Sequence, residues 1–204
     1  MEEKIICIKK EIISGYLNQS KVFYDENLLN NILNNFQVIS RSEAEKNYGC
    51  KQIIVYILIK SGDLYLTYRR TAKTNEQRLR EKYSIGIGGH VNINDTVTLF
   101  DYENKKELFL EAVWREIKEE INIKSKIIKE PVLICYINDD SVDVGKVHLG
   151  TVWLLEIEQP IVSIRGEKGI GKLKFEDLSN LQTNKKHFET WSQLLIDYFK
   201  TQKC

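Results

Sequence analysis

Residues 105–123 read KKELFLEAVWREIKEEINI, and this stretch carries the strongest signal for both fold and function. Phe109, Ala112 and Val113 recur at the three- and four-residue spacing that places side chains on one helix face. The pattern predicts an amphipathic helix over about residues 105–120. Asn104 can cap the start of this helix, and Asn122 can end it, because asparagine tolerates the left-handed backbone conformation.

Acidic residues continue the apolar face of this helix. At 100° per residue, Glu119 lies about 60° to one side of Glu116, and Glu120 lies about 40° to the other side. Three carboxylates this close repel one another, and the helix dipole also disfavours anions near the C-terminal end. Oxygen-rich clusters suit Mg²⁺ or Mn²⁺, so the pattern predicts a divalent metal site. The alternative is a solvated acidic helix face, which such runs usually form.

Upstream of this helix the pattern is typical of strands. Residues 51–60 read KQIIVYILIK, and a turn at Ser61-Gly62-Asp63 separates them from LYLTY at 64–68, which predicts a hairpin with a three-residue turn. A polar segment then leads to YSIGIGGH at 83–90, which predicts a strand that ends at Gly88 and Gly89.

Downstream, strands are predicted around residues 132–137 and 147–157, and a final helix over 185–200. Residues 1–48 form an N-terminal structural extension, in which Asp25 can cap a helix that continues through Phe36. No internal repeat or linker composition is present. We therefore predict a single domain over residues 1–204, of the α/β (α+β) class, with a mixed sheet between helices.

Charge and cysteine content restrict the partners and the compartment. The 204 residues contain 30 Lys and Arg against 29 Asp and Glu, a net charge of +1, so no global field attracts nucleic acid or an anionic membrane. Four separated cysteines form no CxxC pair, the first residues are acidic, and no apolar run approaches a membrane span. We expect a cytoplasmic protein with free thiols, which holds anionic partners at a local site.

The helix and the paired glycines together resemble the Nudix hydrolase signature, G-x5-E-x7-R-E-U-x-E-E-x-G-U, where U is a bulky aliphatic residue. The matching positions are Gly89, Glu107, Arg115, Glu116, Ile117, Glu119, Glu120 and Ile123. Seventeen residues separate Gly89 from Glu107 where the motif has five, so twelve are inserted, and Asn122 replaces the second glycine. Strings at 83–90, 147–150 and 189–192 also resemble a bacterial Nudix subgroup described as phosphoesterases.

The resemblance implies an α/β/α sandwich and metal-dependent hydrolysis of a pyrophosphate bond in a nucleoside-diphosphate-linked or related phosphorylated compound. The partner would be a small molecule, a nucleotide derivative, rather than a nucleic acid duplex or a membrane. Mg²⁺ or Mn²⁺ would bind Glu116, Glu119, Glu120 and the Gly88 carbonyl. Glu119 is the expected general base, and Glu167, in the loop at 165–169, is the alternative.

Two other functions share the same fold. One is a Nudix-fold module that binds a nucleotide or metabolite without turnover; such modules typically lose some of the acids, whereas all are present in this chain. The other is an isomerase, which would need a cysteine near the site, for which Cys50 and Cys135 are the candidates.

Several further residues are candidates around the substrate. The positively charged side chains of Arg70 and Arg78 could point toward substrate phosphates, or they could belong to a solvated loop. Gly89 and His90 are expected beside the substrate because of their position at the strand end. Structural roles within the motif are expected for two residues: Arg115 would orient the acids, and Glu107 would complete either the motif or a capping box.

Overall fold

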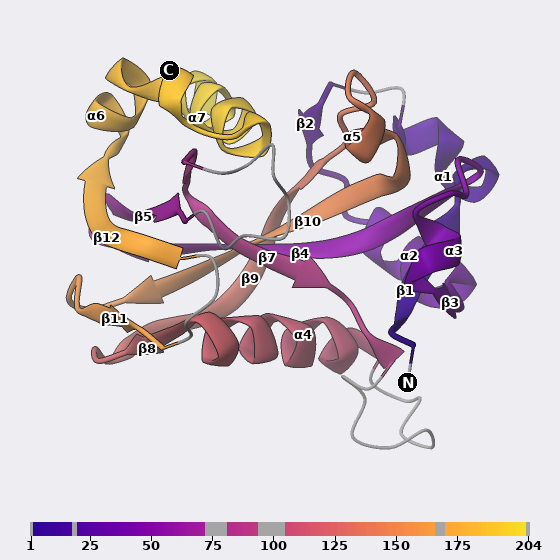
Figure 1. Ribbon diagram of the computed structural model, residues 1–204, viewed down its shortest axis with the longest axis horizontal. Helices are drawn as coiled ribbons and strands as arrows, with labels where there is room; N and C mark the ends of the chain where they lie inside the picture. Colours follow the sequence, from indigo (N-terminus) through magenta and orange to yellow (C-terminus); the bar gives the residue numbers. More distant parts are fainter. Residues whose placement is uncertain (1, 18–19, 72–80, 94–104, 166–169, 203–204) are drawn as a thin grey trace. The chain divides into compact units, whose positions relative to one another are not determined.

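The computed structural model describes residues 2–17, 20–71, 81–93, 105–165 and 170–202, and Figure 1 follows the chain through its helices and strands. The internal contacts divide the chain into two units. Unit 1 comprises Met1–Tyr56, Gly88–Arg115 and Leu133–Val152, and unit 2 comprises Ile57–Ile87, Glu116–Val132 and Trp153–Cys204. Four long elements contribute residues to both units: β4 (Cys50–Ser61), α4 (Lys105–Glu120), β9 (Ile127–Ile137) and β10 (His148–Ile157).

In unit 1, β1 (Lys4–Lys9) pairs antiparallel with both β3 (Gln37–Ser40) and β4, and β2 (Val22–Phe23) pairs with β9. The segment predicted as an N-terminal extension therefore supplies strands to the sheet. Helices α1 (Lys10–Leu17), α2 (Leu28–Asn35) and α3 (Arg41–Ala44) lie close to these strands (Figure 1). Helix α2 is held by four buried aliphatic residues at helical spacing, Leu28, Leu29, Ile32 and Leu33.

In unit 2, β5 (Leu64–Arg70) lies between β4 and β12 (Ile170–Asp177) and also pairs with β6 (Tyr83–Ser84). A separate two-stranded sheet joins β8 (Ile121–Ile123) to β11 (Val162–Ile164). The C-terminal part contains α6 (Leu178–Thr183), the 3₁₀ helix η4 (Lys185–His187) and α7 (Thr190–Gln202). Phe199 of α7 stacks on Tyr65 of β5 with ring centroids 5.7 Å apart, which attaches α7 to this strand.

The predicted α+β class, with a large mixed sheet and helices, is confirmed, and α4 begins and ends at the predicted residues. The hairpin between β4 and β5 is also present, but its turn is shorter than predicted. Ser61 pairs with Leu64, so only Gly62 and Asp63 form the loop, and the φ of Gly62 is +56°. Glycine adopts this left-handed conformation without the steric cost of a side chain.

Two predicted helix starts and the conformation predicted for one helix-ending residue are wrong. Helix α2 begins at Leu28, with Asn27 at the N-cap position; the Asp25 carboxylate accepts a hydrogen bond from the Asn27 N–H, two residues on, before the helix starts. Asn122 does not end α4 in a left-handed conformation, because it already belongs to β8, opposite Ser163. The last α-helix begins at Thr190 rather than Lys185, since Phe188 is extended after η4.

Among the described residues, no helix is both long and apolar enough to cross a membrane.

A tight backbone contact holds the short helix α5 (Asp143–Val147) in unit 1. A Cβ atom added at Gly145 would lie only 1.7 Å from the Asp139 carbonyl oxygen. The Gly145 carbonyl in turn accepts a hydrogen bond of 2.7 Å from the fully buried Lys51 ammonium, which also pairs with Asp140. Only glycine fits at this position without a backbone shift.

We expect Gly145→Ala to lower the free energy of unfolding by at least about 1–3 kcal/mol, because the added methyl group overlaps backbone atoms. Gly15→Ala is the matched control, since nothing lies within 4 Å of a Cβ at this position in α1. There, alanine should raise the stability by about 0.5–1 kcal/mol. Urea denaturation measures both values, and equal midpoints for Gly145→Ala and the parent would contradict the tight contact.

Candidate active site

The three acidic residues of α4 differ in their exposure. Glu116 is buried, with 8% of its surface exposed, whereas Glu120 is half-buried and Glu119 is exposed. Ile117 is buried next to them, so this part of the helix packs against the protein interior of unit 2. The acidic face therefore extends from the interior to solvent, as expected for acids that line a site rather than a fully solvated helix face.

The donor chemistry of this face fits a hard divalent cation, because carboxylate oxygens are the preferred ligands of Mg²⁺ and Mn²⁺. Glu116 and Glu120 are one helical turn apart, and Glu119 lies between them along the chain. In the part of the chain that the structure describes, no three His, Cys, Asp or Glu side chains are already grouped as a metal site.

Tyr68 of β5 is buried, and charged groups on several elements of unit 2 act electrostatically on its hydroxyl. The Tyr68 hydroxyl donates a hydrogen bond of 2.8 Å to the Gly86 carbonyl. Burial raises the pKa of Tyr68, the Arg70 cation opposes this shift, and the negative charges of Glu189 and Glu120 add to it. The Tyr68 hydroxyl is therefore influenced by Glu120 of α4, Arg70 of β5 and Glu189 next to α7.

Arg70 was predicted as a substrate-binding residue, and the structure places it in this cluster. Its side chain is 19% exposed, and its guanidinium carbon lies 5.5 Å from the centroid of the Tyr68 ring. A guanidinium nitrogen of Arg70 is 3.7 Å from a carboxylate oxygen of Glu189. The sequence analysis included Glu189 only in the string at 189–192 and assigned it no individual role. The one local indication was that this acid directly precedes an apolar helix.

In unit 1, Gly88 approaches β4 closely. A Cβ atom at Gly88 would lie 3.0 Å from the Val55 carbonyl oxygen and 3.1 Å from the Tyr56 ring. Glycine at this position therefore allows the backbone of β7 (Gly86–His90) to pack against β4. The adjacent Gly89 is half-buried in the same strand.

The His90 side chain is held by one hydrogen bond and one ring contact within unit 1. Its Nε2 lies 2.8 Å from the Gln52 side-chain oxygen, and its ring centroid is 5.5 Å from that of His148. Burial, together with the positive charges of Arg41, His148 and Arg115, lowers the pKa of His90 to about 3. His90 is therefore neutral near pH 7.

Arg115 was predicted to orient the acids. Its Nη2 atom donates a hydrogen bond of 2.8 Å to the His90 carbonyl, so it supports the backbone directly after the paired glycines. Glu107 is exposed in the first turn of α4. Arg78 and Glu167 lie outside the described residues, as do residues 94–104 of the inserted segment at 91–104, including the predicted N-cap Asn104.

Cys7, Cys50 and Cys135 are free thiols, as predicted, and all three are buried. Burial raises the pKa of Cys135 to about 12, and burial together with nearby Cys50 and Glu43 raises the pKa of Cys7 to about 12. Thiols with such pKa values are poor nucleophiles at neutral pH. This finding disfavours a cysteine-dependent isomerase that would use Cys135.

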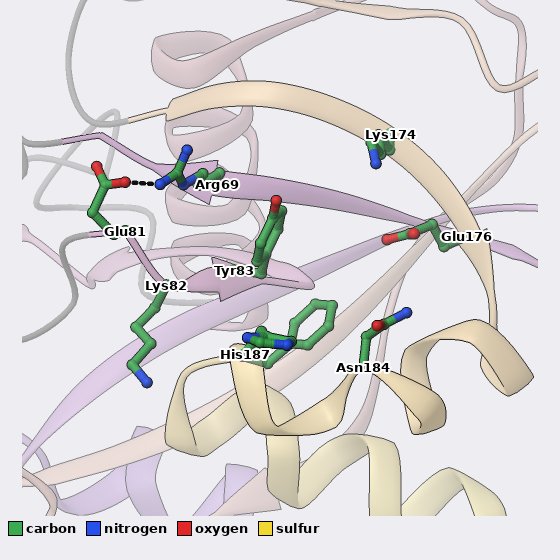
Figure 2. A pocket seen from close by; sticks show the side chains of 9 residues that line it. Arg69, Glu81, Lys82, Tyr83, Lys174, Glu176, Asn184 and His187 are labelled. Carbon is green, nitrogen blue, oxygen red and sulfur yellow. Dashed lines mark hydrogen bonds and ion pairs between the residues drawn. The ribbon is translucent and has the colours of Figure 1, made fainter.

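A cavity of about 630 Å³ lies within unit 2, on the other side of β5 from the Tyr68 cluster. Figure 2 shows its lining, which includes Arg69, Glu81, Tyr83 and Glu176. Arg69 forms an ion pair with Glu81, and Glu176 accepts a hydrogen bond from the Thr67 hydroxyl. Because neighbouring residues of a strand point to opposite faces, Arg69 belongs to the cavity and Arg70 does not.

Comparisons with known proteins give one curated relative and several similar structures. No protein-family profile matches the chain. Protein YmaB of Bacillus subtilis (strain 168) is 32% identical over 170 residues, which are 79% of this chain and 77% of YmaB. The crystal structure of Tm1382, a candidate Nudix hydrolase, is 27% identical and superposes with a TM-score of 0.77, covering 97% of this chain and 98% of Tm1382.

A more distant structure shares the fold alone. It is a bifunctional NMN adenylyltransferase/ADP ribose pyrophosphatase of Francisella tularensis, complexed with AMP and a Mn ion. It is 16% identical, with a TM-score of 0.53, and the match covers 74% of this chain and 42% of that protein.

We expect Arg115→Met to lower the free energy of unfolding by about 1–3 kcal/mol, because the His90 carbonyl loses a charged hydrogen-bond donor. Lys118→Met is the control, since Lys118 is exposed on the same helix. It should change the stability by no more than about 0.5 kcal/mol. Chemical denaturation compares the two, and equal effects would show that the bond to His90 contributes nothing.

Proposed function

Because the chain belongs to the Nudix family, we propose that it is a metal-dependent hydrolase that cleaves the pyrophosphate bond of a nucleoside-diphosphate-linked or related phosphorylated compound. The observation that carries this proposal is the acidic face of α4, on which Glu116 is buried, Glu120 half-buried and Glu119 exposed. Three carboxylates on one helix face supply the oxygen ligands that a hard divalent cation prefers. Retention of all three acids favours a catalyst over a module that only binds.

The exposure of the acids suggests a division of roles. Glu116 and Glu120, the more buried pair, would hold the metal, and the Gly88 carbonyl stays a predicted additional ligand. Mg²⁺ or Mn²⁺ would neutralise the substrate phosphates and lower the pKa of an attacking water. Glu119 is exposed, so water can reach its carboxylate, and we assign it as the general base that accepts the proton. Glu167 stays the alternative base.

Arg70 would bind a phosphate of the substrate. Its guanidinium group lies in the cluster around Tyr68, and Glu120 acts on the same hydroxyl. A planar guanidinium group matches phosphate oxygens with two parallel hydrogen bonds, which orients the bond to be cleaved. Gly89, His90 and Arg78 stay predicted contacts of the substrate, and a neutral His90 could donate or accept a hydrogen bond without adding charge.

The name of one protein that shares the fold guides the choice of the first test substrate. The Francisella protein, which acts on ADP ribose, was crystallised with AMP and a Mn ion. We therefore place ADP-ribose first in a turnover screen of nucleoside diphosphate derivatives, with Mg²⁺ and Mn²⁺ tested separately. Release of a phosphorylated product supports the hydrolase. Tight binding without product in every metal condition would instead identify a binding module.

A thermal-shift experiment tests the metal assignment without any substrate. With free Mn²⁺ at about a hundredfold excess over its Kd, the melting temperature should rise by about 5–10 °C, equivalent to about 2.7 kcal/mol. The double variant Glu116→Gln/Glu120→Gln should lose this rise, because its amides bind the cation weakly. Glu111→Gln, an exposed acid on the same helix, should keep it. A full rise in the double variant would place the metal elsewhere.

Glu119→Gln tests the general base. The substitution should lower kcat by about 10²–10⁴-fold and change KM little, because the proton transfer occurs in the transition state. Stopped-time product assays on the substrate found in the screen give both constants, with Glu111→Gln again as the control. A fall in kcat of less than about threefold would move the base elsewhere in the chain.

A further inference from the structure

Glu189 is a buried acid next to the start of α7, and its two carboxylate oxygens contact side chains of two different strands. It is 7% exposed. One carboxylate oxygen, Oε1, accepts a hydrogen bond of 2.5 Å from the Ser84 hydroxyl of β6. The other, Oε2, lies 3.7 Å from a guanidinium nitrogen of Arg70 on β5. A buried carboxylate is expensive to desolvate, so these partners must compensate its charge.

The attachment of α7 to the strands does not require this negative charge. The Glu189 backbone N–H donates to the Tyr83 carbonyl at 2.9 Å, and the Ile85 N–H donates to the Ser192 hydroxyl at 3.1 Å. The Gln193 side-chain amide also donates to the Phe188 carbonyl at 2.7 Å. The Ser84 and Ser192 hydroxyls also donate to Glu189 Oε1, but the amide oxygen of a glutamine at position 189 could accept both bonds and keep the same shape. The carboxylate charge therefore needs another explanation.

Arg70 supplies this explanation. The Tyr68 ring restrains one face of its guanidinium group, and the Glu189 carboxylate attracts one of its edges. Tyr68 is itself fixed, because it is buried and its hydroxyl donates to the Gly86 carbonyl. Two rigid neighbours thus restrict the orientation of a side chain that otherwise has many rotamers. A guanidinium group held in advance loses less conformational entropy when it binds an anion.

We infer that Glu189 is a positioning residue that holds the Arg70 guanidinium group against Tyr68, in the orientation that binds a phosphate of a diphosphate-containing substrate. This inference rests on the proposed function for the substrate class, but the restraint of Arg70 is present without substrate. Glu189 itself does not touch the reacting atoms. The Glu189 carboxylate attracts the Arg70 guanidinium group and keeps it in place. The charge of Glu120 acts on the Tyr68 hydroxyl next to it.

The restraint can be measured directly by NMR of the arginine guanidinium nitrogens in the full-length protein. In the parent, rotation about the Arg70 Cζ–Nε bond should be slow enough to give separate Nη signals, assigned by their loss in Arg70→Lys. Glu189→Gln should merge these signals. The control is Gln193→Ala, which removes a bond at the start of α7 without touching the carboxylate; it should leave them separate even if it lowers the melting temperature. Unchanged signals in Glu189→Gln would overturn the inference.

Binding of methylenediphosphonate, a diphosphate analogue that resists hydrolysis, then tests the link to phosphate. In calorimetry with Mg²⁺, Glu189→Gln should weaken binding about 5–20-fold, and Gln193→Ala less than about twofold. In Arg70→Gln, adding Glu189→Gln should have almost no further effect, because one residue acts through the other. Additive losses would overturn the positioning role. No binding by the parent, with the Arg70 restraint intact, would instead count against the proposed diphosphate substrate.

Discussion

Repulsion among the carboxylates at the C-terminal end of α4 is the constraint on which the functional account depends. Glu116, Glu119 and Glu120 share one face, and the carbonyl end of the helix adds further negative potential. Glu116 cannot relieve the repulsion by moving into water, because the packing that buries Ile117 also buries it. If a cation binds among these acids as proposed, its binding should also stabilise the fold.

The surrounding elements of unit 2 supply the complementary charge. Strand β5 carries Arg70, and the residue before α7 carries the carboxylate that compensates it. The charges of Arg70 and Glu189 act on the Tyr68 hydroxyl, and so does the charge of Glu120 on the acidic face of α4. One cation, Arg70, and two carboxylates, those of Glu189 and Glu120, thus act on one buried hydroxyl.

Local patterns were sufficient to predict much of the fold. The apolar spacing of α4 predicted its two ends correctly, and the β-branched run of β4 predicted a strand, because both signals repeat over many residues. The helix starts predicted at Asp25 and Lys185 were wrong by a few residues. Asn122 does not adopt the predicted left-handed conformation, because its pairing with Ser163 overrides its local preference. Arg70 was identified as a cation near a strand, but the role of Glu189 depends on contacts between residues 105 positions or more apart, which no local pattern encodes.

The most direct test of the central claim is the anomalous diffraction of a crystal grown with Mn²⁺, measured at the manganese absorption edge. The account predicts a peak within coordinating distance of the Glu116 and Glu120 carboxylates, with the Glu119 carboxylate facing the same region. A well-occupied peak bound by other residues, with the α4 carboxylates facing only water, would contradict it.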